Sequence, residues 1–255
     1  MKRVIKIGGR AQGSTDLPGR LGSAWSASPG SFCVVHGGGD KISEIQRRAG
    51  LEPSFVDGRR ITTRQDMELV RMVLSGLVNK ELVSCLFAAG LPAVGISGED
   101  AGTITAAPID PAGFGRAGKP VAVRSNLIDN LLSAGYLPVI SPVAVEEGAS
   151  SEALNVNGDD AAAAIAIALS ASELLFVADV TGVLDDSGKL ITALGQAEAA
   201  ELVERGVISH GMRAKLEAGF AALTGGVGRV RISTLEGLTD TTAGTLMTFA
   251  PSLIP

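Results

Sequence analysis

Apolar and polar positions follow two rhythms along the chain, and these predict strands and helices in turn. Short runs rich in Val and Ile, each closed by glycine, proline or a turn residue, are typical of buried strands. These runs are RVIKIGG (3–9), FCVVHGGG (32–39), PAVGISG (92–98), YLPVISP (136–142), ELLFVADVTG (173–182) and GRVRIST (228–234). Helical periodicity covers residues 40–49, 65–89, 125–134, 159–170, 196–205 and 211–224.

The alternation of these elements predicts an α/β fold, with helices on both faces of a mainly parallel sheet. Such an arrangement is a three-layer αβα sandwich. Residues 99–120 contain several Gly and Pro and predict a small hairpin outside this scheme. No internal repeat or low-complexity linker marks a boundary, so residues 1–255 are expected to form a single domain. In open sheets of this type, ligands bind at the carboxyl ends of the strands.

Composition and charge restrict the class of protein. Of the 255 residues, 45% are hydrophobic and 4% aromatic, and 33 are glycine, which favours aliphatic strands with tight turns over an aromatic-rich sandwich. The net charge of -5 argues against nucleic acid or an anionic membrane as a partner. The longest apolar run, AAAAIAIAL, is too short to span a bilayer, and lysines and arginine interrupt the first strand, so a soluble cytoplasmic protein is expected. Cys33 and Cys85 lie in apolar runs and are predicted to be inert core thiols.

Glycine turns follow the first two predicted strands. KIGG places Lys6 inside the first strand and Gly8 and Gly9 at its end, and HGGGDKI places glycines 37–39 before a helix. Backbone N–H groups of glycine can approach an anion without interference from Cβ, and a helix N-terminus favours negative charge. Two such turns favour a bound anion, with plain turns as the alternative. Neither matches GxGxxG or GxxxxGK[ST], which disfavours dinucleotide-binding and Walker-type sites.

Four polar positions have both a structural and a catalytic interpretation. Asp159 and Asp160 precede a helix that is apolar all round, where they could simply favour the helix start. Lys215 lies at the border of the apolar stripe of helix 211–224, where a lysine commonly covers apolar surface. His36 introduces a glycine turn, which favours a local structural role. Phosphoryl transfer is compatible with this set, because it needs positioned charge and no covalent nucleophile.

Taken together, these motifs resemble the amino acid kinase family. The likeness runs from Arg3 to about Thr245 and rests on collinear motifs. They are KIGG, VVHGGGDKISEIQRRAG, FVDGRRITT, VNKELV, GYLPVISPV, LNVNGDDAAAAIA, VADVTGVLDD and GVISHGMRAKL. The resemblance is strongest to members that use ATP to phosphorylate the side-chain carboxylate of N-acetyl-L-glutamate, the second step of arginine biosynthesis. It implies a substrate-binding lobe of about residues 1–170 and a nucleotide-binding lobe of about 171–255.

The resemblance also implies site residues. Lys6 and Lys215 would stabilise the transferred phosphoryl group, Asp159 would organise both lysines, and Asp160 would be a helix-start charge. The further residues implied are Gly8 and Gly9 as N–H donors to that group, Gly38, Gly39, Arg60 and Asn155 for the amino acid substrate, and Asp179, Val180, Thr181, Gly182, Val183, Leu184, Val207, Ile208 and Ser209 for the nucleotide. ATP and Mg²⁺ are the expected cofactors, with Mg²⁺ carried by ATP and no metal site on the protein.

Two positions depart from the family pattern. Gly158 stands where many members carry Ala, and Arg10 stands where an apolar residue is common. Both bear on substrate identity, which leaves carrier-linked aminoadipate or another N-acylated glutamate as alternatives. A non-catalytic sensor of nucleotide or amino acid is a further alternative, which the joint presence of Lys6, Asp159 and Lys215 disfavours.

The resemblance carries an expectation about assembly. Arginine-inhibited members have an extra N-terminal helix that links dimers into a hexameric ring, whereas this sequence opens almost directly on KRVIKIGG. We therefore expect an arginine-insensitive homodimer. MELVRMVLSGLV, within residues 65–89, carries more apolar residues than one buried face requires, so this helix is the expected dimer surface.

Overall fold

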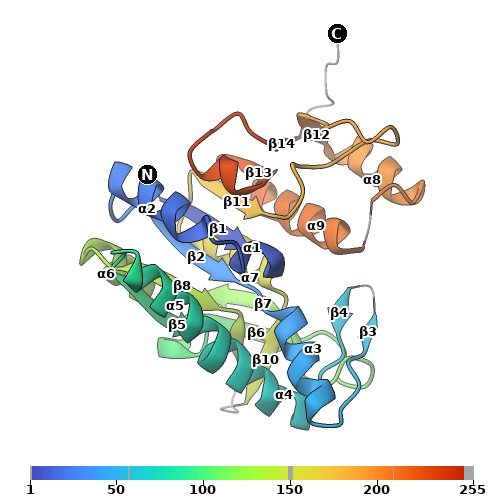
Figure 1. Ribbon diagram of the computed structural model, residues 1–255. Coiled ribbons are helices and arrows are strands. Elements are labelled where there is room, and N and C mark those ends of the chain that lie inside the picture. The colour runs from blue at the N-terminus through green and yellow to red at the C-terminus, as the bar shows by residue number, and fades with distance from the viewer. Residues whose placement is uncertain (1, 57, 149–151, 209, 250–255) are drawn as a thin grey trace.

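The computed structural model describes residues 2–56, 58–148, 152–208 and 210–249, and an eight-stranded sheet forms its centre (Figure 1). The strand order is β12 (Ala193–Gly195), β14 (Thr245–Thr248), β13 (Val230–Ser233), β11 (Glu173–Val177), β1 (Arg3–Ile7), β2 (Phe32–His36), β8 (Leu137–Ser141) and β5 (Ala93–Ser97). Neighbours run parallel except for β13 and β14, so the predicted, mainly parallel sheet is confirmed. Strands from residues 1–170 form one half and strands from 171–255 the other, with β1 beside β11.

Helices lie on both faces of this sheet, which confirms the three-layer αβα prediction (Figure 1). They are α1 (Gly9–Gln12), α2 (Leu17–Ala27), α3 (Gly39–Arg48), α4 (Arg64–Arg71), α5 (Asn79–Ala88), α6 (Asn126–Ser133), α7 (Gly158–Ala168), α8 (Gln196–Glu204) and α9 (His210–Thr224), with single 3₁₀ turns at Asp100–Gly102 and Leu235–Leu238. Helix α7 packs against α9 and lies on β1 and β11, so the apolar helix is buried as predicted. None of the described helices combines the length and apolar character needed to cross a membrane.

The long helix predicted over 65–89 consists of three consecutive pieces. Between α4 and α5 the chain forms a π-helix, η1 (Met72–Val78), whose wider turns shift the helical register. Leu74 and Val78 of this segment are buried and face Gly38, at the start of α3. The π-helix therefore packs directly against the second glycine turn.

A second, smaller sheet closes into a four-stranded barrel beside the carboxyl end of the central sheet. It consists of β10 (Ala153–Val156), β7 (Ala117–Val123), β6 (Ile104–Pro108) and β9 (Val143–Glu146). The predicted hairpin over 99–120 is confirmed as the antiparallel pair β6–β7, which extends slightly further along the chain. A separate two-stranded hairpin of β3 (Phe55–Val56) and β4 (Arg59–Arg60) lies opposite this barrel (Figure 1).

The two cysteines have different environments. Cys33, on β2, is fully buried in the main core as predicted, and burial raises the pKa of its thiol to about 12. The prediction for Cys85 is wrong, because this side chain is exposed on α5. Leu82 and Leu86 supply the buried face of that helix, and Cys85 falls on the other side of it.

Candidate active site

The carboxylate of Asp159 lies between two lysines from distant parts of the chain. Lys6 extends from β1, Asp159 stands in the first turn of α7, and Lys215 projects from α9. The Nζ atom of Lys6 is 2.8 Å from Oδ1 of Asp159, and the Nζ atom of Lys215 is 3.2 Å from Oδ2. The structure therefore brings together the three charged residues that the resemblance placed at the centre of the site.

Burial and neighbouring charge shift the pKa values of Lys6 and Asp159 in opposite directions. Burial of Lys6 lowers the pKa of its ammonium group, although the Asp159 carboxylate counteracts part of that effect. Burial also disfavours ionised Asp159, but the two lysine charges outweigh it and hold the pKa of the carboxyl below its ordinary value. With all three groups ionised, two positive charges face one negative charge. The net positive charge suits a bound anion.

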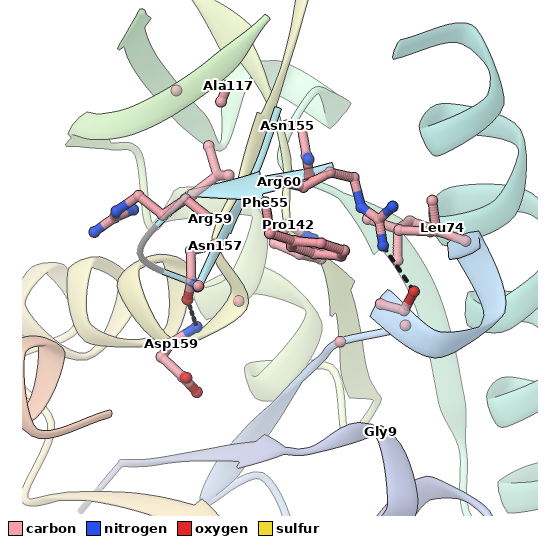
Figure 2. Close-up of a pocket in the computed structure, with 18 of the residues that line it drawn as sticks. Gly9, Phe55, Arg59, Arg60, Leu74, Ala117, Pro142, Asn155, Asn157 and Asp159 are labelled. Atoms are coloured by element: carbon pink, nitrogen blue, oxygen red, sulfur yellow. Dashed lines mark hydrogen bonds between the residues drawn. The ribbon is translucent and has the colours of Figure 1, made fainter. Parts of the chain in front are cut away.

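Helix α7 begins with a side-chain cap that leaves Asp159 free for the lysines. The Oδ1 atom of Asn157 accepts hydrogen bonds from the N–H groups of Asp159 (2.8 Å) and Asp160 (3.4 Å), as Figure 2 shows for Asp159. Asn157 therefore caps α7, whereas the sequence suggested Asp159 and Asp160 for the start of this helix. Asp160 does lie in the first turn, as predicted, and its carboxylate also forms an ion pair with Arg59 at 2.6 Å.

A pocket opens beside this triad, bounded by the glycine turns, the β3–β4 hairpin, the barrel and the start of α7 (Figure 2). Its lining includes these residues from the predicted site: Lys6, Gly9, Gly38, Gly39, Arg60, Asn155 and Asp159. The residues predicted to bind the amino acid substrate come from positions 38 to 155 of the sequence, and all of them face one cavity.

The guanidinium of Arg60 is buried and held by α3. It donates to the backbone oxygen of Gly39 and to Oγ of Ser43, both at 2.8 Å, and to Oε1 of Gln46. Phe55 packs against its face, with Cζ of Arg60 4.5 Å from the ring centroid. Burial lowers the pKa of the guanidinium, which nevertheless stays charged because its ordinary pKa is so high.

Residues that the sequence did not single out hold Arg60 in place. Gln46 accepts from Arg60 and donates to Asp66 at 2.6 Å, and Asp66 in turn forms a capping box with Thr63 at the start of α4. The T-x-x-D spacing at 63–66 is a visible helix-start signal. Nothing in the sequence, however, connects it with Arg60.

The two glycine turns differ in how they meet the pocket. The N–H of Gly8 already donates to the backbone oxygen of Val177 at 3.0 Å, whereas Gly9 lines the pocket. A Cβ at Gly38 would come within 2.7 Å of Cδ2 of Leu74. Close packing against the π-helix therefore explains the need for glycine at position 38.

The side chains of Asn155 and His36 both have hydrogen-bond partners within the protein. Nδ2 of Asn155 donates to Oγ1 of Thr62 at 3.0 Å, which joins the barrel to the segment after β4. Nδ1 of His36 lies 2.7 Å from the backbone oxygen of Gly37, and Nε2 lies 3.0 Å from Nδ2 of Asn79. Burial lowers the pKa of His36 to about 4, which favours the neutral ring, and both ring nitrogens have partners within the fold.

The residues predicted for the nucleotide lie in the other half of the molecule and do not line this pocket. Residues 179–184 follow β11, where Val183 is buried and its N–H donates to Oγ1 of Thr245 at 2.8 Å. Val207 and Ile208 are half-buried just before α9, and Ser209 lies outside the described residues. Within the described ranges, no cluster of three or more His, Cys, Asp or Glu side chains could hold a metal ion.

Known proteins are similar to this chain in sequence and in fold. The sequence model of the amino acid kinase family matches residues 1–233. An acetylglutamate kinase of Chloroflexus aurantiacus is 43% identical over 240 residues, covering 93% of each chain. The acetylglutamate kinase of Aliarcobacter butzleri is 40% identical over 235 residues, which is 90% of this chain and 77% of that protein.

A solved structure extends the likeness to three dimensions. The crystal structure of a Streptococcus mutans protein superposes with a TM-score of 0.87 at 28% identity, covering 97% of this chain and 98% of that one. The family match covers most of the chain, and the relatives align along nearly its full length. This chain belongs to the amino acid kinase family.

Proposed function

We propose that this protein uses ATP to phosphorylate the side-chain carboxylate of N-acetyl-L-glutamate, giving the acyl phosphate in the second step of arginine biosynthesis. The observation that carries the proposal is the Lys6–Asp159–Lys215 group at the edge of a pocket that also contains Arg60. Relatives that align with most of this chain and are named acetylglutamate kinase support the choice of substrate.

The chemistry follows from where the charges lie. An oxygen of the substrate carboxylate forms a bond to phosphorus while the bond between that phosphorus and the ADP oxygen breaks, so no proton has to move. Bound with Mg²⁺, ATP supplies the phosphoryl group. Lys6 and Lys215 stabilise the negative charge on its oxygens, and Asp159 keeps both ammonium groups oriented. Gly9 supplies an N–H at the same end of the pocket, and Gly8 would need to release Val177 to do so.

The pocket offers a separate group for the other end of the substrate. Arg60 would pair with the α-carboxylate, and Asn155 with Gly38 and Gly39 would hold the remainder of the molecule. The guanidinium of Arg60 lines the pocket and is held in place by Gln46, Gly39 and Ser43, which supports this assignment. The free amine of glutamate would place a positive charge in this pocket, and desolvating a charge costs far more than desolvating an amide. N-acetylglutamate should therefore be preferred to glutamate.

The nucleotide would bind in the half of the molecule formed by residues 171–255. We assign the segments 179–184 and 207–209 to it, with Mg²⁺ held by the phosphates of ATP. Support comes from their position after β11 and before α9, the helix that carries Lys215. ATP bound there would present its terminal phosphate to both lysines.

The functional unit is proposed to be a homodimer that pairs through the helical rod α4–η1–α5. Met72 and Phe87 are large apolar side chains of this rod and are 65% and 72% exposed. A second copy of the same rod would cover both side chains through one symmetric interface.

Product trapping tests the proposed reaction. Purified protein is incubated with ATP, Mg²⁺ and hydroxylamine, which converts an acyl phosphate into a coloured hydroxamate. N-acetylglutamate should give the fastest reaction, ahead of glutamate, N-succinylglutamate and carrier-linked aminoadipate. A faster reaction with another acid would replace the substrate. Binding of ATP without any product from these acids would instead indicate a sensor.

A further inference from the structure

Two adjacent arginines of the β3–β4 hairpin reach opposite sides of the pocket. Neighbouring residues of a strand point to opposite faces, and Figure 2 shows Arg60 directed towards α3 while Arg59 is directed over the start of α7. Arg60 is attached to α3 through Gly39, Ser43 and Gln46. Arg59 contributes the attachment on the other side.

That second attachment is an ion pair with Asp160. The Nη1 atom of Arg59 lies 2.6 Å from Oδ2 of Asp160, and the two side chains are only 23% and 13% exposed. A partly buried, charge-assisted hydrogen bond of this kind is stronger than an exposed pair such as Arg64–Glu152, whose side chains are 80% and 38% exposed. The pair therefore has the burial expected of a contact that restrains the hairpin.

Apart from the hydrogen bonds of Arg60 to α3, the described part of the hairpin makes few buried contacts. Strands β3 and β4 pair only with each other, and Phe55 and Val56 are 51% and 43% exposed. The segment after β4 is fixed by Thr62, whose N–H donates to the backbone oxygen of Phe114. Among the described residues, Arg59–Asp160 is the ion pair that ties the hairpin to α7.

We propose that Arg59 and Asp160 act as a positioning pair, which holds the hairpin across the pocket and thereby places Arg60 for the acyl amino acid. Asp160 adjoins Asp159 in the first turn of α7, so the pair fixes the hairpin to the same turn that carries the catalytic carboxylate. The identity of the ligand in this inference rests on the proposed function. The restraint on the hairpin does not.

An electrostatic role of Arg59 makes a different prediction from a positioning role. If Arg59 acted only by its charge, Arg59→Gln would leave an unpaired anion near an anionic substrate and weaken binding. Asp160→Asn would leave an unpaired cation and strengthen binding. If the pair positions the hairpin, both substitutions remove the same restraint and weaken binding alike.

Steady-state kinetics separate these cases. We expect Arg59→Gln and Asp160→Asn each to raise the KM for N-acetylglutamate about tenfold, with kcat and the KM for ATP changed by less than about threefold. The double variant should be no worse than either single variant, and Arg59→Lys should recover part of the loss. Arg64→Gln, which removes the exposed pair with Glu152, serves as the matched control and should leave all constants unchanged. Opposite shifts of the two single variants, or no shift in either, would overturn the proposal.

Hydrogen–deuterium exchange provides the measurement that needs no substrate. Peptides covering residues 54–62 should exchange faster in Arg59→Gln and Asp160→Asn than in the wild type, while peptides from the central sheet stay the same. Equal exchange of the hairpin in all three proteins would refute the restraint, whatever the enzyme phosphorylates. Faster exchange in a protein that phosphorylates none of the acids would retain the restraint and reject the proposed function alone.

Discussion

Asp159 is the residue through which β1, α7 and α9 meet, because its two carboxylate oxygens contact one lysine each. Removing either lysine leaves the other charge and the guanidinium of Arg60 in place. The effect should therefore fall on the step in which negative charge moves from the nucleotide to the acceptor.

We expect Lys215→Ala to lower kcat by roughly 10²–10³-fold, by analogy with the loss of one oxyanion donor, while both KM values change much less. Lys6→Ala should behave alike. Lys41→Ala, which removes a half-buried lysine paired with Glu44, is the control. Near-normal turnover of Lys215→Ala would mean that this lysine only covers apolar surface.

Arg60 allows a second test at the scale of one side chain. Lysine keeps the charge but loses the planar fork that contacts several acceptors, so Arg60→Lys should raise the KM for N-acetylglutamate roughly 10- to 100-fold. The KM for ATP should stay nearly the same. Equal increases in both constants would indicate that Arg60 supports the fold instead of binding the substrate.

His36 links stability to pH. Its folded pKa is about 4, below the ordinary value of about 6.5, so between these values the unfolded chain binds more protons than the folded protein. The low pKa of His36 therefore contributes fully to the free energy of unfolding above about pH 6.5, and this contribution falls as the pH drops towards 4. At ~1.4 kcal/mol per pKa unit, the change is about 3 kcal/mol.

Urea unfolding of the wild type and His36→Gln from pH 7 to pH 4 measures this contribution. The stability advantage of the wild type should shrink as the pH falls. A constant difference across that range would show that the ring titrates alike in both states.

At the scale of elements, the contact of the π-helix η1 with the glycine turn gives a paired prediction. A Cβ at position 38 would clash with Leu74, whereas a Cβ at position 39 would meet nothing within 4 Å. Gly38→Ala should lower the free energy of unfolding by about 1–3 kcal/mol, and Gly39→Ala should change it little. Chemical denaturation of the two variants checks this, and equal losses would contradict the packing argument.

The elements that could be predicted from sequence are those with a strong local pattern. Strand β2 (FCVVH) and helix α7 are nearly continuous apolar runs, so consecutive residues already indicate that both faces of these elements are buried. Helix α2 escaped prediction although Leu17, Leu21 and Trp25 recur at helical spacing, because Pro18 and two nearby glycines lower its helix propensity. Packing of Trp25 edge-on against Phe32 helps hold it.

The residues of the candidate site also fall into two groups, those that a sequence motif indicates and those that only the structure brings together. The glycine turns and Lys6 could be recognised because they belong to compact motifs. The Arg59–Asp160 pair could not, since it joins residues 101 positions apart and depends on how the hairpin lies across α7. Helical spacing alone leaves the role of Lys215 ambiguous. The structure shows that the ammonium group of Lys215 points to the carboxylate of Asp159.

At the scale of the whole molecule, assembly can be tested on the exposed rod α4–η1–α5. We expect analytical ultracentrifugation to give a dimer for the wild type and a monomer for Phe87→Glu, because a buried carboxylate on each side of a symmetric interface would face its own copy. Phe249→Glu is the control, since Phe249 is 60% exposed on the last described residues of the other half. A dimer that persists in Phe87→Glu would place the interface elsewhere.

The position of β1 in the middle of the central sheet has a consequence for synthesis on the ribosome. The residues of β2 follow β1 closely in the chain, whereas those of β11, the other neighbour of β1, are made about 170 positions later. During that interval the edge that will meet β11 offers free N–H and C=O groups to any passing strand. A nascent chain stalled before residue 173 would therefore lack the strand that covers this edge of the Lys6-bearing segment, and would display the edge to chaperones or to other nascent chains.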